Sequence, residues 1–117
     1  MKILHVIFSC NRIKYLTRSL ASHHLLDYGS HSVDRLIIDD YPKTRNSAIF
    51  NLLCKTHNFN SLLQEDNLGL SVTWTAFFNF LKNTDYDYIL HQEDDVVLTR
   101  RISIDDMINC LESDPKM

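Results

Sequence analysis

Residues 86–98, YDYILHQEDDVVL, carry a run of aromatic and aliphatic residues into three consecutive carboxylates, Glu93, Asp94 and Asp95. The first part of this stretch is typical of a β-strand. If the backbone stays extended beyond it, Glu93 and Asp95 point to one side and Asp94 to the other. Adjacent carboxylates repel one another, and a hard divalent cation such as Mg²⁺ or Mn²⁺ would relieve that cost. The stretch therefore predicts a metal site at a strand end, and a solvated acidic loop is the alternative.

Around this stretch the chain alternates short apolar runs with segments of helical periodicity. Strands are expected at 2–8, 33–38, 59–63 and 86–91, and helices at 13–26, after Pro42, from Ser71 and from Ser103. This order predicts an α/β domain with a Rossmann-like parallel sheet and helices on both faces. The runs 2–8 and 86–91 are dense in apolar residues, so we expect them to be adjacent inner strands.

Helical spacing also assigns an apolar face to each of the later helices. The residues expected to face inward are Ile49, Leu52, Leu53, Trp74, Phe77, Phe78, Leu81, Met107, Ile108 and Leu111. The six histidines have no metal-binding spacing. We expect His23 and His24 on a helix surface, and His5 and His91 in the core or at a sheet edge.

Composition places the chain among ordinary globular domains. Its 117 residues suit a single domain, with 44% apolar and 23% charged residues. The net charge of -3 and the lack of a basic run argue against nucleic-acid binding. No apolar run reaches the ~20 residues that span a bilayer. The cysteines Cys10, Cys54 and Cys110 are odd in number and widely spaced, which predicts a reducing, cytoplasmic location.

Polar residues follow the expected strands at the points where they end. They are Ser9, Asn11 and Arg12 after the first strand, Asp39 and Asp40 after the second, 65–67 after the third, and Glu93, Asp94 and Asp95 after the fourth. Parallel sheets bind ligands beyond the carboxyl ends of their strands, so these clusters predict one binding edge. The guanidinium fork of Arg12 suits phosphate oxygens. Alternatively, Asn11 and Arg12 cap the next helix and pair with an acid.

The stretch 86–98 resembles the strand and DXD-type motif of GT-A glycosyltransferases. Its Glu-Asp-Asp form is similar to the variant in N-acetylglucosaminyltransferase I and its relatives. The resemblance implies that Asp95 contacts the metal and Glu93 the nucleotide ribose. It also implies that Asp94 lies near the donor sugar or near a structural arginine.

Two earlier segments carry the same resemblance. Ser9-Cys10-Asn11-Arg12 resembles the segment of family 2 enzymes that cradles the nucleotide base and diphosphate. The segment 37–40 resembles a motif whose Asp binds uracil, which implies a UDP-linked donor held by Asp40 or, failing that, by Asp39. The segment 67–69 resembles an Asn-x-Gly turn before the donor-binding helix, although the arginine that family 2 often carries early in that helix is absent here.

The resemblance implies a glycosyltransferase that moves a sugar from a nucleoside-diphosphate donor, with Mn²⁺ or Mg²⁺ as cofactor. The uracil-binding motif implies that the nucleotide of this donor is UDP. It covers the nucleotide-sugar-binding half of a GT-A domain, so we expect the domain to be incomplete at its C-terminus, to turn over little by itself and to expose apolar surface that favours self-association. The acceptor and the catalytic base are not identified. The alternatives are a non-catalytic nucleotide-sugar-binding module or truncated fragment and, less favoured, a receiver-like signalling domain.

Overall fold

The computed structural model describes residues 1–10, 12–39, 47–63 and 70–113. Its strands are β1 (Lys2–Ser9), β2 (Leu26–Asp27), β3 (Ser32–Asp39), β4 (Asn60–Leu63), β5 (Tyr88–Glu93) and β6 (Ile102–Ser103). Its helices are α1 (Ile13–Ala21), the 3-10 turn η1 (Ser22–Leu25), α2 (Ser47–Thr56), α3 (Leu70–Leu81) and α4 (Ile104–Ser113).

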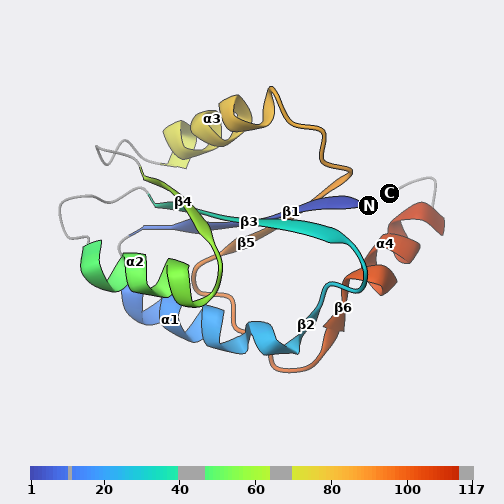
Figure 1. Ribbon diagram of the computed structural model, residues 1–117, viewed down its shortest axis with the longest axis horizontal. Coiled ribbons are helices and arrows are strands. Elements are labelled where there is room, and N and C mark those ends of the chain that lie inside the picture. Colours follow the sequence, from blue (N-terminus) through green and yellow to red (C-terminus); the bar gives the residue numbers. More distant parts are fainter. Residues whose placement is uncertain (11, 40–46, 64–69, 114–117) are drawn as a thin grey trace.

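The main sheet has four parallel strands in the order β4-β3-β1-β5. Helices α1 and α2 cover one face of this sheet and α3 covers the other, so three layers stack in the order helix, sheet, helix (Figure 1). A separate two-stranded parallel pair, β2 with β6, lies beside α4. The predicted α/β fold, a parallel sheet with helices on both faces, is therefore confirmed.

Side-chain alternation along β1 divides the core between these layers. Ile7 packs with Leu16 and Leu20 of α1 and with Phe50 of α2. The opposite face of β1 packs against Phe77 of α3; its buried residues are Leu4, Val6 and Phe8. Because both faces of β1 are covered, its apolar run is almost continuous, as expected for an inner parallel strand.

A third apolar cluster lies at the amino end of β1. Ile3 packs there against Ile104 and Ile108 of α4. Its partly buried neighbours come from the two sheets and the loop between them: Leu26, Tyr28, Val33, Tyr88 and Leu90. This cluster joins the β2–β6 pair and α4 to the main sheet.

The expectation of two adjacent inner strands is half right. β1 and β5 are neighbours, with Ile3 aligned to Tyr88 and Phe8 to Glu93. Among the described residues, however, β5 is the edge strand of the main sheet, so its inner position was a wrong prediction. Leu90 and Tyr88 of β5 pack in the cluster formed with α4, and on the other face His91 contacts Trp74 of α3 while Ile89 is 44% exposed. Density of apolar residues reports cover above and below a strand, and it does not report neighbours on both sides.

Helix rotation accounts for the other differences. In α2 the buried residues are Phe50 and Cys54, whereas Ile49 and Leu52 are 44% and 64% exposed. In α4 the inward residues are Ile104 and Ile108, and Met107 and Leu111 are exposed; in α3 Phe77 is buried and Phe78 is exposed. Several of these helices carry apolar residues on more than one face, so spacing alone did not decide which face meets the sheet. No helix in the described part of the chain combines the length and the apolar character needed to cross a membrane.

Candidate functional site

The carboxyl ends of three neighbouring strands meet at one edge of the main sheet. Ser9 at the end of β1 is aligned with Asp39 at the end of β3, and Phe8 is aligned with Glu93 at the end of β5. The sequence-predicted residues Ser9, Arg12, Asp39, Glu93, Asp94 and Asp95 all lie at or just beyond these strand ends. Asn11, Asp40 and the 65–69 segment lie outside the described residues, so their predicted roles remain predictions.

Asp94 is the structural centre of this edge. Its side chain is 0% exposed, and its backbone N–H donates to the Phe8 carbonyl oxygen at 3.0 Å. Its carboxylate accepts from the Cys10 backbone N–H at 3.3 Å and from Arg12 Nε at 3.2 Å, and Arg12 Nη2 donates to the other carboxylate oxygen. Two parallel bonds of this kind fix both position and angle. Asp94 therefore ties the segment after β1 to the end of β5.

Arg12 lies immediately before α1, with its side chain 43% exposed. Its hydrogen bonds to Asp94 raise the pKa of the guanidinium. The guanidinium carbon also lies 5.4 Å from the centre of the Tyr15 ring. Of the alternatives open from the sequence, the structure contains the ion pair with an acid. Arg12 makes no side-chain hydrogen bond that caps α1.

The other two carboxylates make no hydrogen bond to this buried pair among the described residues, although the charge of Asp95 also raises the pKa of Arg12. Glu93 is the last residue of β5, and its Oε1 lies 3.5 Å from His91 Nε2. Asp94 and Asp95 form a turn, in which the Val96 N–H donates to the Glu93 carbonyl oxygen at 3.3 Å. The backbone is thus not extended through the three acids, which corrects that premise. Asp94 is nevertheless directed inward while Asp95 is exposed.

The donor chemistry of this edge decides whether a divalent cation fits. The described residues contain no group of three or more His, Cys, Asp or Glu side chains arranged to hold a metal ion. Mg²⁺ and similar ions are commonly bound by one or two carboxylates, with substrate phosphates and water completing the shell. Asp95 offers such a carboxylate, whereas Asp94 is occupied by Arg12. The residues therefore fit a cation shared with a phosphate ligand and do not form an all-protein metal cage.

Asp39 and Ser9 are the buried polar residues at the carboxyl edge of the sheet. Asp39 is 1% exposed and Ser9 is 4% exposed, and Asp39 makes interactions within the fold. Cys10, which follows Ser9, is exposed. The strand ends therefore combine buried polar groups with the outward-facing carboxylates of Glu93 and Asp95.

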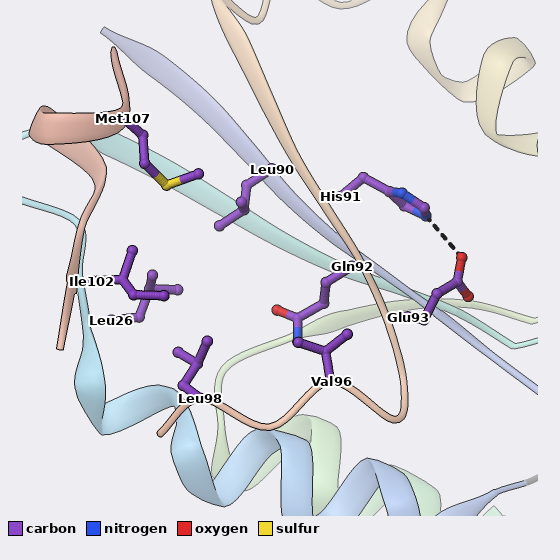
Figure 2. A pocket seen from close by; sticks show the side chains of 9 residues that line it. All are labelled: Leu26, Leu90, His91, Gln92, Glu93, Val96, Leu98, Ile102 and Met107. Atoms are coloured by element: carbon purple, nitrogen blue, oxygen red, sulfur yellow. Dashed lines mark ion pairs between the residues drawn. The ribbon is translucent and has the colours of Figure 1, made fainter. Parts of the chain in front are cut away.

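A pocket of about 340 Å³ adjoins Glu93 on the side of β5 that faces β2 and β6 (Figure 2). Its lining is mainly apolar and comprises Leu26, Leu90, His91, Gln92, Glu93, Val96, Leu98, Ile102 and Met107. Sequence reasoning did not identify this pocket. The one local sequence signal for this pocket was the apolar run at 96–98 directly after the acids. Leu26 and Ile102 could not be assigned to it from the sequence, because only the pairing of β2 with β6 brings them there.

A buried hydrogen-bond chain runs beneath the same edge. His5, 0% exposed, donates from Nε2 to Gln92 Oε1 at 2.6 Å, and the Tyr28 hydroxyl donates to His5 Nδ1 at 2.6 Å. The Gln92 amide donates in turn to Ser19 Oγ at 3.0 Å. Burial lowers the pKa of His5 to about 4, so the ring is neutral at pH 7. The expectation of a satisfied core histidine is confirmed for His5. The hydrogen-bond chain also anchors β5 at Gln92, one residue before Glu93.

Proteins of known structure share this fold, although their sequences differ widely from that of this chain. No protein-family model matches the sequence, and no curated protein matches it either. Solved structures do: TarS of S. aureus superposes with a TM-score of 0.71 at 18% identity, over 97% of this chain and 20% of that chain. A structure of TarS 1-349 in complex with UDP-GlcNAc superposes with a TM-score of 0.64 at 19% identity, over 96% of this chain and 30% of that chain. The chain thus spans a fifth to about a third of the TarS chains that it matches, and the likeness shows a shared fold.

Proposed function

We propose that the chain binds a nucleoside-diphosphate sugar, with UDP as the nucleotide, at the carboxyl edge of its parallel sheet. In this proposal the edge is the donor-binding part of a metal-dependent glycosyltransferase. One observation carries the proposal: nearly the whole chain shares its fold with a protein that has been crystallised with UDP-GlcNAc. The position of three acids at the end of β5, where parallel sheets bind ligands, supports it independently.

The three acids have different roles in this proposal. Asp94, held by Arg12 and by the Cys10 N–H, positions the turn and does not contact the metal. Asp95 is exposed at that turn and supplies the carboxylate ligand to Mn²⁺ or Mg²⁺, and Glu93 accepts hydrogen bonds from the nucleotide ribose. When bound, the metal supplies charge neutralisation for the departing diphosphate. Asp94 thereby gives its neighbours a fixed geometry, which keeps them oriented before any ligand arrives.

The remaining contacts come from the ends of β1 and β3. In this proposal Asp40, or Asp39 in its place, accepts from the uracil N3–H, and Ser9 and Asn11 contact the base and the diphosphate. The Arg12 guanidinium is 43% exposed on its side chain, so it can approach phosphate oxygens while it keeps its bonds to Asp94. These are proposals for contacts, and each is tested by the loss of nucleotide affinity in the corresponding variant.

Calorimetric titration with UDP tests the proposal most directly. The diphosphate is an anion that approaches carboxylates, so we expect it to bind only when Mn²⁺ lies between them, with metal and nucleotide binding cooperatively. Asp95→Asn keeps the shape of the side chain and removes its charge, so the Mn²⁺ dependence should disappear. Asp106→Asn, an exposed acid in the first turn of α4, is the matched control and should bind like the unmodified chain.

Two results would refute the assignment. The first is equal UDP affinity with and without Mn²⁺, and the second is a preserved Mn²⁺ response in Asp95→Asn. Sugar transfer is a separate measurement: with UDP-GlcNAc as donor we expect binding but little turnover by this chain, because no catalytic base is identified among its residues. Binding without turnover would favour a nucleotide-sugar-binding module, and robust transfer would favour an enzyme.

A further inference from the structure

A second pocket, with a polar lining, lies on the sheet face covered by α1 and α2, away from the carboxyl edge. Its volume is about 260 Å³, and it opens between η1, β3 and the residues that precede β4. Its polar lining consists of His23, His24, Tyr28, Arg35 and His57, and none of the described residues that line it carries a carboxylate. In a chain whose net charge is -3, this lining carries the permanent positive charge of one arginine and the N–H donors of three histidines.

Arg35 supplies the permanent charge of this pocket. It lies on β3 four residues before Asp39, on the same face of the sheet, which places it about 13 Å from the candidate nucleotide edge. Its guanidinium carbon lies 4.7 Å from the centre of the Tyr28 ring. None of the ion pairs among the described residues includes Arg35. The fork of Arg35 is therefore held over an aromatic ring without a carboxylate partner in that part of the chain.

His23 adds a second donor to the same pocket. Its Nε2 is buried and has no hydrogen-bond partner among the described residues. Burial and then the charge of His57 lower the pKa of His23 to about 4, with a smaller contribution from Arg35, while a hydrogen bond between the ring and the Gln92 side chain acts in the opposite direction. A buried polar atom without a partner is costly in a folded protein. A ligand that accepts a hydrogen bond from this ring would remove that cost.

The chemistry of the lining selects an anion over a cation. Arg35 stays protonated at any pH at which the protein is folded, and it repels a metal ion. The described residues also contain no set of three His, Cys, Asp or Glu side chains arranged for a metal. The fork of an arginine and the N–H groups of imidazole rings instead match the oxygens of a phosphate.

We infer that the pocket formed by His23, His24, Tyr28, Arg35 and His57 binds a small oxyanion of the phosphate type. In this proposal Arg35 provides the fixed charge, and His23 and His57 donate hydrogen bonds to the anion. The volume exceeds that of phosphate alone, so a phosphate monoester with a small organic group also fits. This site is separate from the proposed nucleotide edge and does not depend on it.

Nuclear magnetic resonance of the histidine rings tests this inference, with inorganic phosphate as the probe at constant ionic strength. Phosphate should shift the His23 and His57 ring signals in a saturable way, and it should raise the pKa of His23 because the anion stabilises the protonated ring. Arg35→Gln should weaken phosphate binding by at least about tenfold, as expected for the loss of charge-assisted bonds. Arg18→Gln, an exposed arginine on α1 outside the pocket, is the matched control and should have no effect.

His57→Gln gives a second variant that leaves the Arg35–Tyr28 contact intact. It should weaken phosphate binding several-fold, and it decides the question if Arg35→Gln does not fold. Asp95→Asn should leave the phosphate response unchanged, which separates this pocket from the nucleotide edge. Ring signals that do not saturate with phosphate, or that respond equally to chloride, would overturn the inference. So would an unchanged phosphate affinity in His57→Gln or in folded Arg35→Gln.

Discussion

Asp94 and His5 are both completely buried, yet the fold accommodates them in opposite ways. Asp94 lies at the carboxyl edge and is matched by a cation and a backbone N–H. His5 lies in the middle of β1 and is hydrogen-bonded to two neutral partners, Tyr28 and Gln92. A charged carboxylate is therefore buried where donors converge from two strand ends, whereas the His5 ring is buried in its neutral form, which the nearby charge of Arg35 also favours. The comparison predicts different sensitivities of the two regions to substitution and to pH.

Removal of the buried carboxylate should have the largest effect. Asp94→Ala leaves Arg12 and the Cys10 N–H without their acceptor, and loss of one partner from a buried ion pair typically costs about 3–5 kcal/mol. Because the Arg12 side chain is 43% exposed, water compensates part of this loss and we expect the lower end of that range. Urea denaturation measures the change in the free energy of unfolding. Asp95→Ala, at the exposed neighbour, should change it by less than about 0.5 kcal/mol, and similar losses in both variants would contradict this account.

Acid should act next most strongly, and through His5. An unfolded histidine takes up its proton near pH 6.5, whereas burial lowers the pKa of folded His5 to about 4. Between these values the unfolded chain binds more protons, so the free energy of unfolding falls as the pH is lowered from 6.5 to 4. Above pH 6.5 the ring is neutral in both states, and this loss does not occur. The loss attributable to His5 is up to about 3 kcal/mol.

The measurement is urea denaturation at a series of pH values between 7 and 4. His23, whose pKa is also lowered to about 4 mainly by burial, acts in the same direction, and its ring centre lies 5.0 Å from that of His5. His5→Gln should flatten the pH dependence, whereas His24→Gln, at an exposed ring, should leave it unchanged. An equally steep loss of stability in His5→Gln would show that other groups dominate acid unfolding.

The same two regions show what the sequence could and could not predict. The alternation of apolar runs was sufficient for the parallel fold, because both faces of β1 are covered and its residues report that directly. The acids at 93–95 were identified as the edge of interest. The inward direction of Asp94 was not fixed, because it depends on Arg12, 82 residues earlier in the chain. Local patterns carry no information on such a pair until the topology places β1 beside β5.

The histidines illustrate the same limit. The sequence predicts His23, like its neighbour His24, on a helix surface. In the structure α1 ends at Ala21, and the 3-10 turn that follows directs the ring of His23 toward His5 and Phe59. The phosphate-type pocket therefore had no counterpart in the sequence analysis. Its lining residues come from three separate segments of the chain, so only the folded structure shows that those described carry no acid.

A smaller effect should follow removal of the neutral partner of His5. Gln92→Leu retains most of the side-chain volume but leaves His5 Nε2 and Ser19 Oγ without the amide between them. We expect a loss of about 1–2 kcal/mol in the free energy of unfolding, the usual cost of leaving a buried donor unpaired. Asn109→Leu, an exposed amide on α4, is the control and should be nearly neutral. An unchanged free energy of unfolding in Gln92→Leu would mean that His5 is satisfied without this hydrogen bond.

The smallest effect should come from a substitution that keeps the charge beside Asp94 and changes only its geometry. Arg12→Lys retains a cation, but a lysine ammonium is a point charge and cannot reproduce the two parallel bonds from Nε and Nη2. Since Asp94 keeps an opposite charge and the Cys10 N–H, we expect a loss of only about 1 kcal/mol, the value of one hydrogen bond. Arg12→Gln, which removes the charge and leaves Asp94 as a buried uncompensated anion, should lose more. Equal losses in the two variants would show that the fork geometry, and not the charge, holds Asp94 at the sheet edge; a loss confined to Arg12→Gln would show the reverse.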